Sequence, residues 1–286
     1  MPVLPDQMHP LKLATNSGAT VGRWRAWVFV AVGSLSVLTA AAGPTLPPSQ
    51  EAAVIEELKA ETDPTIMKRR VWLETEWNKY TDGSNDIEET FGGLWAWRVT
   101  TNMDWGVRLK VPWEWHLAGN SAGDSDENGL GDIKTATGTA FRLSEKWRGA
   151  GGLELRMPTA WNDMGDNDWR LQEFVATAYD LKPWLTLSPS AEYNASIAKR
   201  SDGTWHNYLE VYAPATVLLP HHWAVTPRYE VKVDFHNDDY VTHSGKLQLV
   251  KQFVDPPLGL MLSIKRAFDG GEKEFQVNCA LTYFFQ

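Results

Sequence analysis

Alternation of apolar and charged side chains is the dominant pattern of this chain, and it is clearest over residues 105–117. Every odd position of this stretch is apolar, whereas even positions include Arg108, Lys110, Glu114 and His116. Successive side chains of a β-strand point to opposite faces, so the stretch predicts a strand with one apolar and one charged face. It is longer than most strands of soluble proteins and has the length of a tilted strand that crosses a bilayer.

The same alternation recurs over residues 67–286 in about twelve segments, and short turns alternate with long loops between them. Bacterial outer-membrane barrels are built in this way, with short periplasmic turns and long extracellular loops. The pattern predicts an all-β fold: a single closed antiparallel transmembrane β-barrel of about 12 strands, with both termini periplasmic. Residues 81–89 are expected to form an acidic loop, and residues 185–197 one uninterrupted strand. A soluble β-sandwich is the alternative, with the apolar faces turned into a core.

Tryptophan is unusually frequent, with 15 in 286 residues. Four of these residues follow short turns directly, namely Trp105, Trp147, Trp184 and Trp223. Their spacing of 42, 37 and 39 residues corresponds to one strand–loop–strand unit each time. Tryptophan is favoured at membrane–water interfaces, so these four are expected to form an interfacial girdle at the periplasmic end of the barrel.

The N-terminal part of the chain is different in character. Residues 1–42 have a basic segment, an apolar run over 26–42 and small residues at its end, which predicts a signal peptide cleaved near Ala42. A membrane-anchor helix is the alternative. Residues 43–66 are expected to be a periplasmic segment with a short helix over 50–61, after Ser49 as N-cap and before Pro64. This segment is either a tail or a small plug that enters a pore.

Composition narrows the possible functions. The formal net charge of −9 argues against nucleic-acid binding and against a polybasic membrane-surface protein. Cys279 is the only cysteine, which excludes an intrachain disulfide and a cysteine-based zinc site. Residues 124–129 match the first half of a calcium-binding loop, but Thr135 stands where the bidentate glutamate belongs. A solvated acidic loop is the preferred interpretation, divalent-cation binding stays open, and neither a metal site nor a cofactor is predicted.

Charged side chains cost free energy when they face lipid, so the charged faces of the strands are predicted to line the barrel lumen. The predicted lumen-lining residues are Arg98, Arg108, Lys110, Glu114, Asp132, Lys134, Arg142, Glu154, Arg156, Glu192, Glu210, Arg228, Glu230 and Lys232. They carry both signs of charge. This mixture fits a wet, narrow pore and equally a lumen filled by ion pairs.

No catalytic residue is predicted, and the protein is not expected to be an enzyme. Adjacent His243 and Ser244 invite comparison with barrel-borne lipid hydrolases such as outer-membrane phospholipase A. Those enzymes use a histidine and a serine two positions apart, on one face of a strand. Neighbouring strand residues point to opposite faces, so His243 and Ser244 are not expected to act together.

Two segments resemble known families. The C-terminal residues 275–286 resemble the closing strand of outer-membrane proteins that the barrel-assembly machinery reads, with Gln286 overhanging the aromatic Phe285. Residues 129–132, Gly-Leu-Gly-Asp, resemble the same segment of the family named for the MetA pathway of phenol degradation. This resemblance implies a bacterial outer-membrane barrel with a transport role, and it implies no substrate.

Together these features predict a narrow channel or transporter for small polar or amphipathic solutes. The alternative is a non-conducting barrel with a binding or structural role through its acidic extracellular loops. The expected partners are outer-membrane lipids, the barrel-assembly machinery and an unknown small solute, with no nucleic acid.

Overall fold

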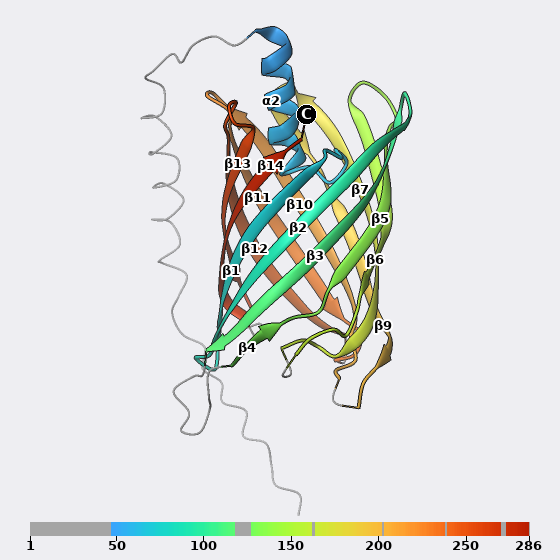
Figure 1. Cartoon of the computed structure of the whole chain (residues 1–286), viewed down its shortest axis with the longest axis vertical. Helices are drawn as coiled ribbons and strands as arrows, with labels where there is room; N and C mark the ends of the chain where they lie inside the picture. The colour runs from blue at the N-terminus through green and yellow to red at the C-terminus, as the bar shows by residue number, and fades with distance from the viewer. Residues whose placement is uncertain are drawn as a thin grey trace, which may run out of the picture. The chain divides into compact units, whose positions relative to one another are not determined.

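The computed structural model describes residues 47–117, 127–161, 164–201, 203–237, 239–269 and 273–285. The predicted signal peptide and residues 124–126 of the calcium-like loop lie outside these ranges. Within them the chain forms one helix followed by strands (Figure 1). The elements are α2 Pro48–Ala60, β1 Arg70–Tyr80, β2 Asn85–Thr100, β3 Met103–Leu117, β4 Glu127–Leu130, β5 Lys134–Arg142, β6 Trp147–Arg156, β7 Asp168–Lys182, β8 Leu185–Leu187, β9 Ser190–Lys199, β10 Asn207–Leu219, β11 Trp223–Asp234, β12 Tyr240–Gln252, β13 Leu258–Ala267 and β14 Lys273–Phe284.

The strands form one closed antiparallel barrel. Each strand pairs with its neighbours along the chain, and β1 pairs with both β2 and β14, which closes the sheet. The segments β8 and β9 share one position between β7 and β10, and β4 pairs only with the end of β3. Counted in this way the barrel has 12 strands, so the predicted fold is confirmed.

The uninterrupted strand expected over residues 185–197 is wrong, because it breaks between β8 and β9 at Ser188 and Pro189. Proline has no amide hydrogen to donate to a neighbouring strand. The backbone still finds partners at the break. The Ser188 amide donates to the Pro214 carbonyl at 3.3 Å, and the Pro189 carbonyl accepts from the Thr177 amide at 3.0 Å.

The acidic loop expected over residues 81–89 is also wrong, since the connection between β1 and β2 spans only residues 81–84. Asp86 and Glu88 lie within β2 and point into the barrel. There Asp86 contacts the His116 ring at 2.6 Å, and Glu88 accepts a hydrogen bond from Thr90 at 2.7 Å. The interior of such a barrel is polar, so a run of acidic residues is compatible with a strand.

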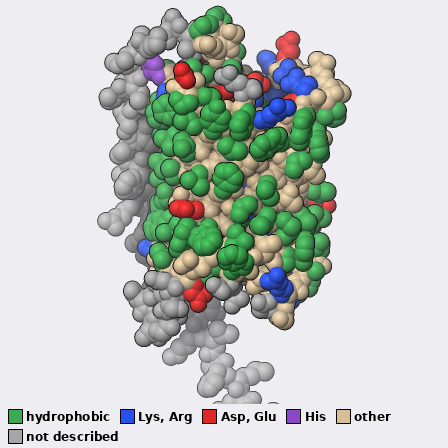
Figure 2. All heavy atoms as spheres, viewed as in Figure 1, with side chains coloured by type: hydrophobic (Ala, Val, Ile, Leu, Met, Phe, Trp, Pro, Cys, Tyr) green, Lys and Arg blue, Asp and Glu red, His purple; other side chains and the backbone are tan. Residues whose placement is uncertain are grey.

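The outer wall of the barrel is apolar. Its half-exposed side chains include Leu73, Phe91, Leu109, Val175, Leu247, Leu262 and Leu281. In the face shown in Figure 2, hydrophobic side chains cover most of the band between the two ends, and charged side chains gather mainly near those ends. Glu89 and Glu173 are exceptions, because both are exposed on the outward side of their strands.

The described helix is not long and apolar enough to cross a membrane. Helix α2 lies at the barrel end that also carries the short turns between β2 and β3, β5 and β6, and β10 and β11 (Figure 1). By the loop-length rule this is the periplasmic end. The predicted short helix over residues 50–61 is observed as α2, over Pro48–Ala60. The predicted N-cap at Ser49 is wrong, because the helix begins earlier: Pro47 is the N-cap and Pro48, whose missing amide hydrogen costs nothing there, is the first helical residue.

Candidate functional site

Helix α2 docks into the periplasmic mouth of the barrel. Leu58, which is 1% exposed, packs against the inward-facing Ala224 and Val250 of β11 and β12. The Gln252 side chain donates to Glu57 at 2.8 Å, in a setting where burial raises the pKa of the Glu57 carboxyl. The segment is thus held by an apolar contact and by polar contacts.

The residues that follow α2 are tied to the inner wall by Arg148. Its guanidinium group contacts Asp63 at 2.9 Å and Asp180 at 2.5 Å. Lys59 of α2 lies 3.4 Å from the same Asp180 carboxylate. The Arg70 side chain also donates to the carbonyl of Ala60 at 2.5 Å. These contacts hold residues 60–67 across the barrel mouth.

On the lumen side of this segment lies a cavity of about 310 Å³, here called the periplasmic chamber. Its wall includes the apolar side chains of Met67, Leu94, Ala136, Phe174 and Pro214. Between and beside them lie the polar side chains of Arg108, Ser188, Glu192, Tyr212 and Arg228. The hydroxyl of the fully buried Ser188 has no hydrogen-bond partner. The chamber therefore presents an amphipathic wall with spare hydrogen-bonding capacity.

A second cavity of about 450 Å³, the extracellular vestibule, opens at the other end of the lumen. Its wall includes Glu210, Tyr212, Glu230, Lys232 and Lys265. Beside it lies a side pocket of about 90 Å³, lined by Lys134, Glu154, Arg156, Arg170, Gln172, Asn194 and Tyr208. The lumen thus has open space on both sides of its middle.

Tyr212 lines both the chamber and the vestibule, which identifies it as part of the constriction between them. Its hydroxyl lies 3.2 Å from Glu192 and 2.9 Å from Glu210. The Arg228 guanidinium stands 4.7 Å from the centre of the Tyr212 ring and pairs with Glu230. A ring held by two carboxylates and a cation is a fixed obstacle, so Tyr212 narrows the lumen at this level.

The structure places the predicted lumen-lining residues at several levels. Arg108, Glu192 and Arg228 line the chamber, whereas Glu210, Glu230 and Lys232 line the vestibule and Lys134, Glu154 and Arg156 the side pocket. Lys110 lies on β3, two residues beyond Arg108 towards the extracellular end. Glu114, further along β3, lies 4.0 Å from the His116 ring.

Three of the predicted residues lie away from the middle of the lumen. Arg98 and Arg142 line a cavity of about 440 Å³ at the periplasmic mouth, where Arg98 pairs with Asp104 at 2.5 Å. Asp132 is 0% exposed and lies in the connection between β4 and β5, so its carboxylate faces loop groups rather than the open lumen.

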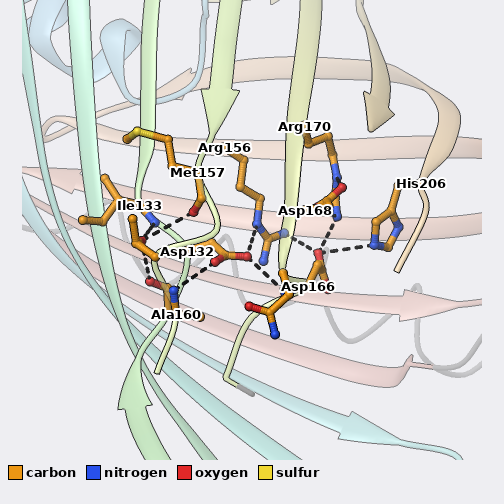
Figure 3. Close-up of polar contacts among 12 residues, drawn as sticks. Asp132, Ile133, Arg156, Met157, Ala160, Asp166, Asp168, Arg170 and His206 are labelled. Atoms are coloured by element: carbon orange, nitrogen blue, oxygen red, sulfur yellow. Dashed lines mark hydrogen bonds and ion pairs between the residues drawn. The ribbon is translucent and has the colours of Figure 1, made fainter. Parts of the chain in front are cut away.

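Asp132 anchors a group of charged residues at the extracellular rim, here called the rim cluster: Asp132, Arg156, Asp166, Asp168, Arg170 and His206 (Figure 3). The Asp132 carboxylate accepts from Arg156 Nε at 3.1 Å, and from the amides of Ala160 at 3.2 Å and Asp166 at 3.0 Å. Through these contacts Asp132, the last residue of the Gly-Leu-Gly-Asp segment, fixes the loop of residues 160–166 to the rim.

Asp166 joins the two arginines of the rim cluster, at 2.6 Å from Arg156 and 2.5 Å from Arg170. Burial alone would raise the pKa of Asp166, but these two guanidinium groups lower it to about 2. Asp166, Asp168 and His206 also have the spacing of a metal site. Because the two arginines already neutralise both carboxylates, the cluster is suited to structural ion pairing.

Several residues that shape the lumen or hold the N-terminal segment are absent from the predicted set of lumen-lining residues. They are either neutral or paired with residues far away in the sequence. Tyr212 alternates in phase with Glu210 on β10, but only charged positions were assigned to the lumen. The ion pairs of Arg148 with Asp63 and Asp180 span 85 and 32 residues. Alternation along single strands carries no signal for such pairs.

The four tryptophans predicted as a girdle all lie beside short turns at the end that carries α2. Trp105, Trp147 and Trp184 are 40–52% exposed on the outer wall, and Trp223 is less exposed. Trp105 stacks on Trp97 with ring centres 5.0 Å apart. The girdle remains a prediction about the membrane interface.

His243 and Ser244 point to opposite sides of β12, as expected. The His243 ring contacts the Tyr229 hydroxyl at 2.6 Å on the outer wall, whereas Ser244 donates to Glu230 at 3.1 Å inside the lumen. Their side chains therefore do not meet, and this pair cannot form a nucleophile–base couple.

Comparison with known proteins identifies no matching family model and no matching curated protein. Several solved structures share the fold. The COG4313 outer membrane channel from Pseudomonas putida F1 aligns with a TM-score of 0.65 and 13% identity, over 77% of this chain and 96% of that one. The NanC porin aligns at 0.51 with 9% identity, over 76% and 99% of the two chains.

The translocator domain of the autotransporter NalP from Neisseria meningitidis gives 0.52 with 10% identity, over 91% and 99%. At these identities the likeness concerns the fold. The closed barrel, its apolar wall and the fold shared with these outer-membrane structures agree with the predicted location in the bacterial outer membrane.

Proposed function

We propose that the protein is a narrow outer-membrane channel for small polar or amphipathic solutes, with Tyr212 at its constriction. The observation that carries this proposal is the pair of cavities that approach Tyr212 from the two ends of the barrel. A barrel with a purely structural role has no need for such space. Its interior could be filled by neutral side chains without the desolvation cost of buried charge.

The structural likeness to proteins named as an outer membrane channel and a porin supports the proposal. A barrel of 12 strands lies between the filled eight-stranded type and the open porins of 16–18 strands. The docked N-terminal segment narrows the periplasmic mouth further. A small conductance is therefore expected, and solutes much larger than the chamber should not pass.

Planar-bilayer recording of the purified full-length mature chain tests the proposal. Wild-type protein should give small discrete current steps, and Tyr212→Ala should increase their conductance several-fold because it removes the ring between the two cavities. Tyr229→Ala is the matched control, since Tyr229 lies on neighbouring β11 but is 46% exposed on the outer wall. Folded barrels that stay silent as wild type and as Tyr212→Ala would favour a role in the extracellular loops.

A further inference from the structure

The cavity of about 440 Å³ at the periplasmic mouth, here called the mouth cavity, is lined by an excess of basic side chains. It lies between the residues that follow α2 and the ends of β2, β3 and β5. Only two of its lining residues are acidic, Glu56 and Asp104. Five are basic: Lys68, Arg69, Arg98, Arg142 and Arg148. The wall of this cavity therefore carries more positive than negative charge.

Both acidic residues of the mouth cavity are already paired. Glu56 contacts Lys68 at 2.6 Å, and Asp104 contacts Arg98 at 2.5 Å. Arg148 is neutralised by the two carboxylates through which it holds the N-terminal segment. The charge balance of the cavity thus depends on its two remaining basic residues.

These residues, Arg69 and Arg142, have no carboxylate partner among the described residues. Arg69 Nε donates to the Ala96 carbonyl at 2.9 Å, which holds this guanidinium group at the cavity wall. Both arginines are exposed, so a ligand can reach them. A guanidinium group binds a phosphate through two parallel hydrogen bonds. The mouth cavity therefore offers two unpaired arginines to a phosphate group.

The same cavity also reaches the apolar outer wall of the barrel. Trp97, Phe141 and Phe285 line it and are 38–42% exposed. Trp97 stacks on Trp105 of the predicted girdle, and Phe285 lies against the outward-facing Trp95 with ring centres 6.0 Å apart. Aromatic rings at the end of a barrel wall are typical of the headgroup level of a bilayer. A ligand of this cavity meets positive charge at the mouth and apolar rings on the membrane side.

We infer that the mouth cavity binds an anionic glycerophospholipid of the periplasmic leaflet, with its phosphate at Arg69 and Arg142 and an acyl chain along Trp97 and Phe285. Basic pockets beside membrane-spanning elements recognise anionic lipid headgroups. The cavity has the volume of a small-molecule site, which suits a phosphoglycerol headgroup while the acyl chains stay on the outer wall. The inference rests on the outer-membrane location and does not depend on conduction.

Native mass spectrometry of the purified full-length mature chain tests this inference. The two probes are phosphatidylglycerol and phosphatidylethanolamine with the same acyl chains, so that only the headgroup differs. Wild type should bind its first phosphatidylglycerol with a Kd at least about tenfold below that for phosphatidylethanolamine, whose ammonium group cancels the phosphate charge. Arg69→Gln/Arg142→Gln should raise the Kd for phosphatidylglycerol about thirtyfold, since each basic residue near an anionic lipid contributes a factor of about five. The preference between the two lipids should then disappear.

Two further variants separate a site from general attraction. Lys146→Gln/Lys182→Gln is the matched control, because both lysines are exposed beside short turns at the same barrel end but do not line the mouth cavity. It should bind both lipids like wild type. Arg142→Gln alone removes a side chain without a partner in the described part of the chain, so it should fold and should weaken phosphatidylglycerol binding about fivefold. Heat-modified migration on gels confirms that each barrel is folded.

Glycerophosphoglycerol, the same headgroup without acyl chains, distinguishes a lipid from a soluble phosphate ester. It should not displace phosphatidylglycerol even in large excess, because it lacks the apolar part that contacts the outer wall. Displacement at concentrations similar to those of the lipid would assign the cavity to a soluble anion. Equal binding of the two lipids, or an equal loss in the lysine variant, would indicate general attraction between charges. Each of these results overturns the lipid inference and leaves the proposed channel function standing.

Discussion

The rim cluster and the constriction are both built from inward-facing charged side chains, but they differ in how completely those charges are paired. At the rim, Asp132 and Asp166 hold Arg156 and Arg170 in contacts of 2.5–3.1 Å. Near the constriction, Lys110 and Lys246 contact no carboxylate that the structure describes. Fully paired charges give a barrel end its shape, whereas lysines without a contact ion pair add charge to the inner wall without fixing its shape.

The largest effect on stability is expected from a substitution at Asp132 of the rim cluster. Asp132→Ala would leave two loop amides without their buried acceptor, while Arg156 keeps its contact with Asp166, so we expect a loss of about 2–5 kcal/mol in the free energy of unfolding. Urea unfolding of the barrel in lipid vesicles, followed by tryptophan fluorescence, measures this loss. Lys110→Met is the contrasting variant and should change stability by less than about 1 kcal/mol, because it removes no pairing. Equal losses of unfolding free energy in Asp132→Ala and Lys110→Met would show that the two regions do not differ in how charge pairing contributes to stability.

The second prediction concerns the docked N-terminal segment. Like the rim cluster it is held by ion pairs, and like the constriction it narrows the lumen. Arg148→Ala removes the contacts with Asp63 and Asp180 and leaves the buried Asp63 without its cation. Hydrogen bonds between charged groups contribute about 2 kcal/mol, so the ratio of undocked to docked segment should rise about thirtyfold. Bilayer recordings should show more frequent transitions to a higher-conductance state.

Arg142 provides the control for this experiment, because it is the direct cross-strand partner of Arg148 on β5. Arg142→Ala should leave the gating pattern unchanged, since Arg142 has no ion pair with the described residues. If both substitutions increased opening alike, general loss of positive charge at the mouth would be the cause. The specific tie between Arg148 and the segment would then be refuted.

The fold could be predicted from the sequence because its signals are local. Each strand shows its own alternation of apolar and polar residues, and the length of each connection can be read directly. The prediction failed where acidic residues point into the barrel, at Asp86 and Glu88, and where a proline interrupts a strand, at Pro189. Alternation along each strand also predicts which charged side chains face the lumen. It did not show which of them are paired, because Arg108 and Glu154 are 46 residues apart and meet only through the register of β3, β5 and β6.

Glu173 extends the comparison to the outer wall, because its carboxylate has no ion pair among the described residues and does not face the lumen. It is exposed on β7 between the apolar Leu153 and the aromatic Tyr193 of the neighbouring strands. A carboxylate facing lipid is less costly than a basic group but still unfavourable, so Glu173→Leu should stabilise the barrel by about 1–2 kcal/mol in vesicles. The matched inward substitution Glu154→Leu should destabilise it, because Glu154 pairs with Arg108. If Glu173→Leu and Glu154→Leu both stabilised the barrel, the pairing of Glu154 with Arg108 would have no influence on barrel stability.

The smallest expected effect is the response of the rim cluster to pH. Burial lowers the pKa of His206, and the neighbouring Arg170 lowers it further, so the folded barrel disfavours protonation of this ring. A folded-state pKa below the unfolded value of about 6.5 gives a stabilising contribution that is complete above that pH and is lost as the pH falls below it. The low pKa of Asp166, at about 2, adds a contribution that persists until the pH falls below about 4.

Between pH 7.5 and 5.5, therefore, protonation of His206 should loosen the loops that the rim cluster holds. Hydrogen exchange, corrected for its intrinsic pH dependence, should speed up at the amides of Arg200 and Thr204, which donate to Asn167 and Asp166. The Tyr80 amide, hydrogen-bonded to Ser84 in the turn between β1 and β2, serves as an internal reference without contact to the cluster. His206→Asn should remove the pH dependence at Arg200 and Thr204 while Tyr80 stays constant. Persistence of the pH effect in that variant would mean that another group titrates at the rim, and pairing by Arg156 and Arg170 would no longer suffice to explain its order.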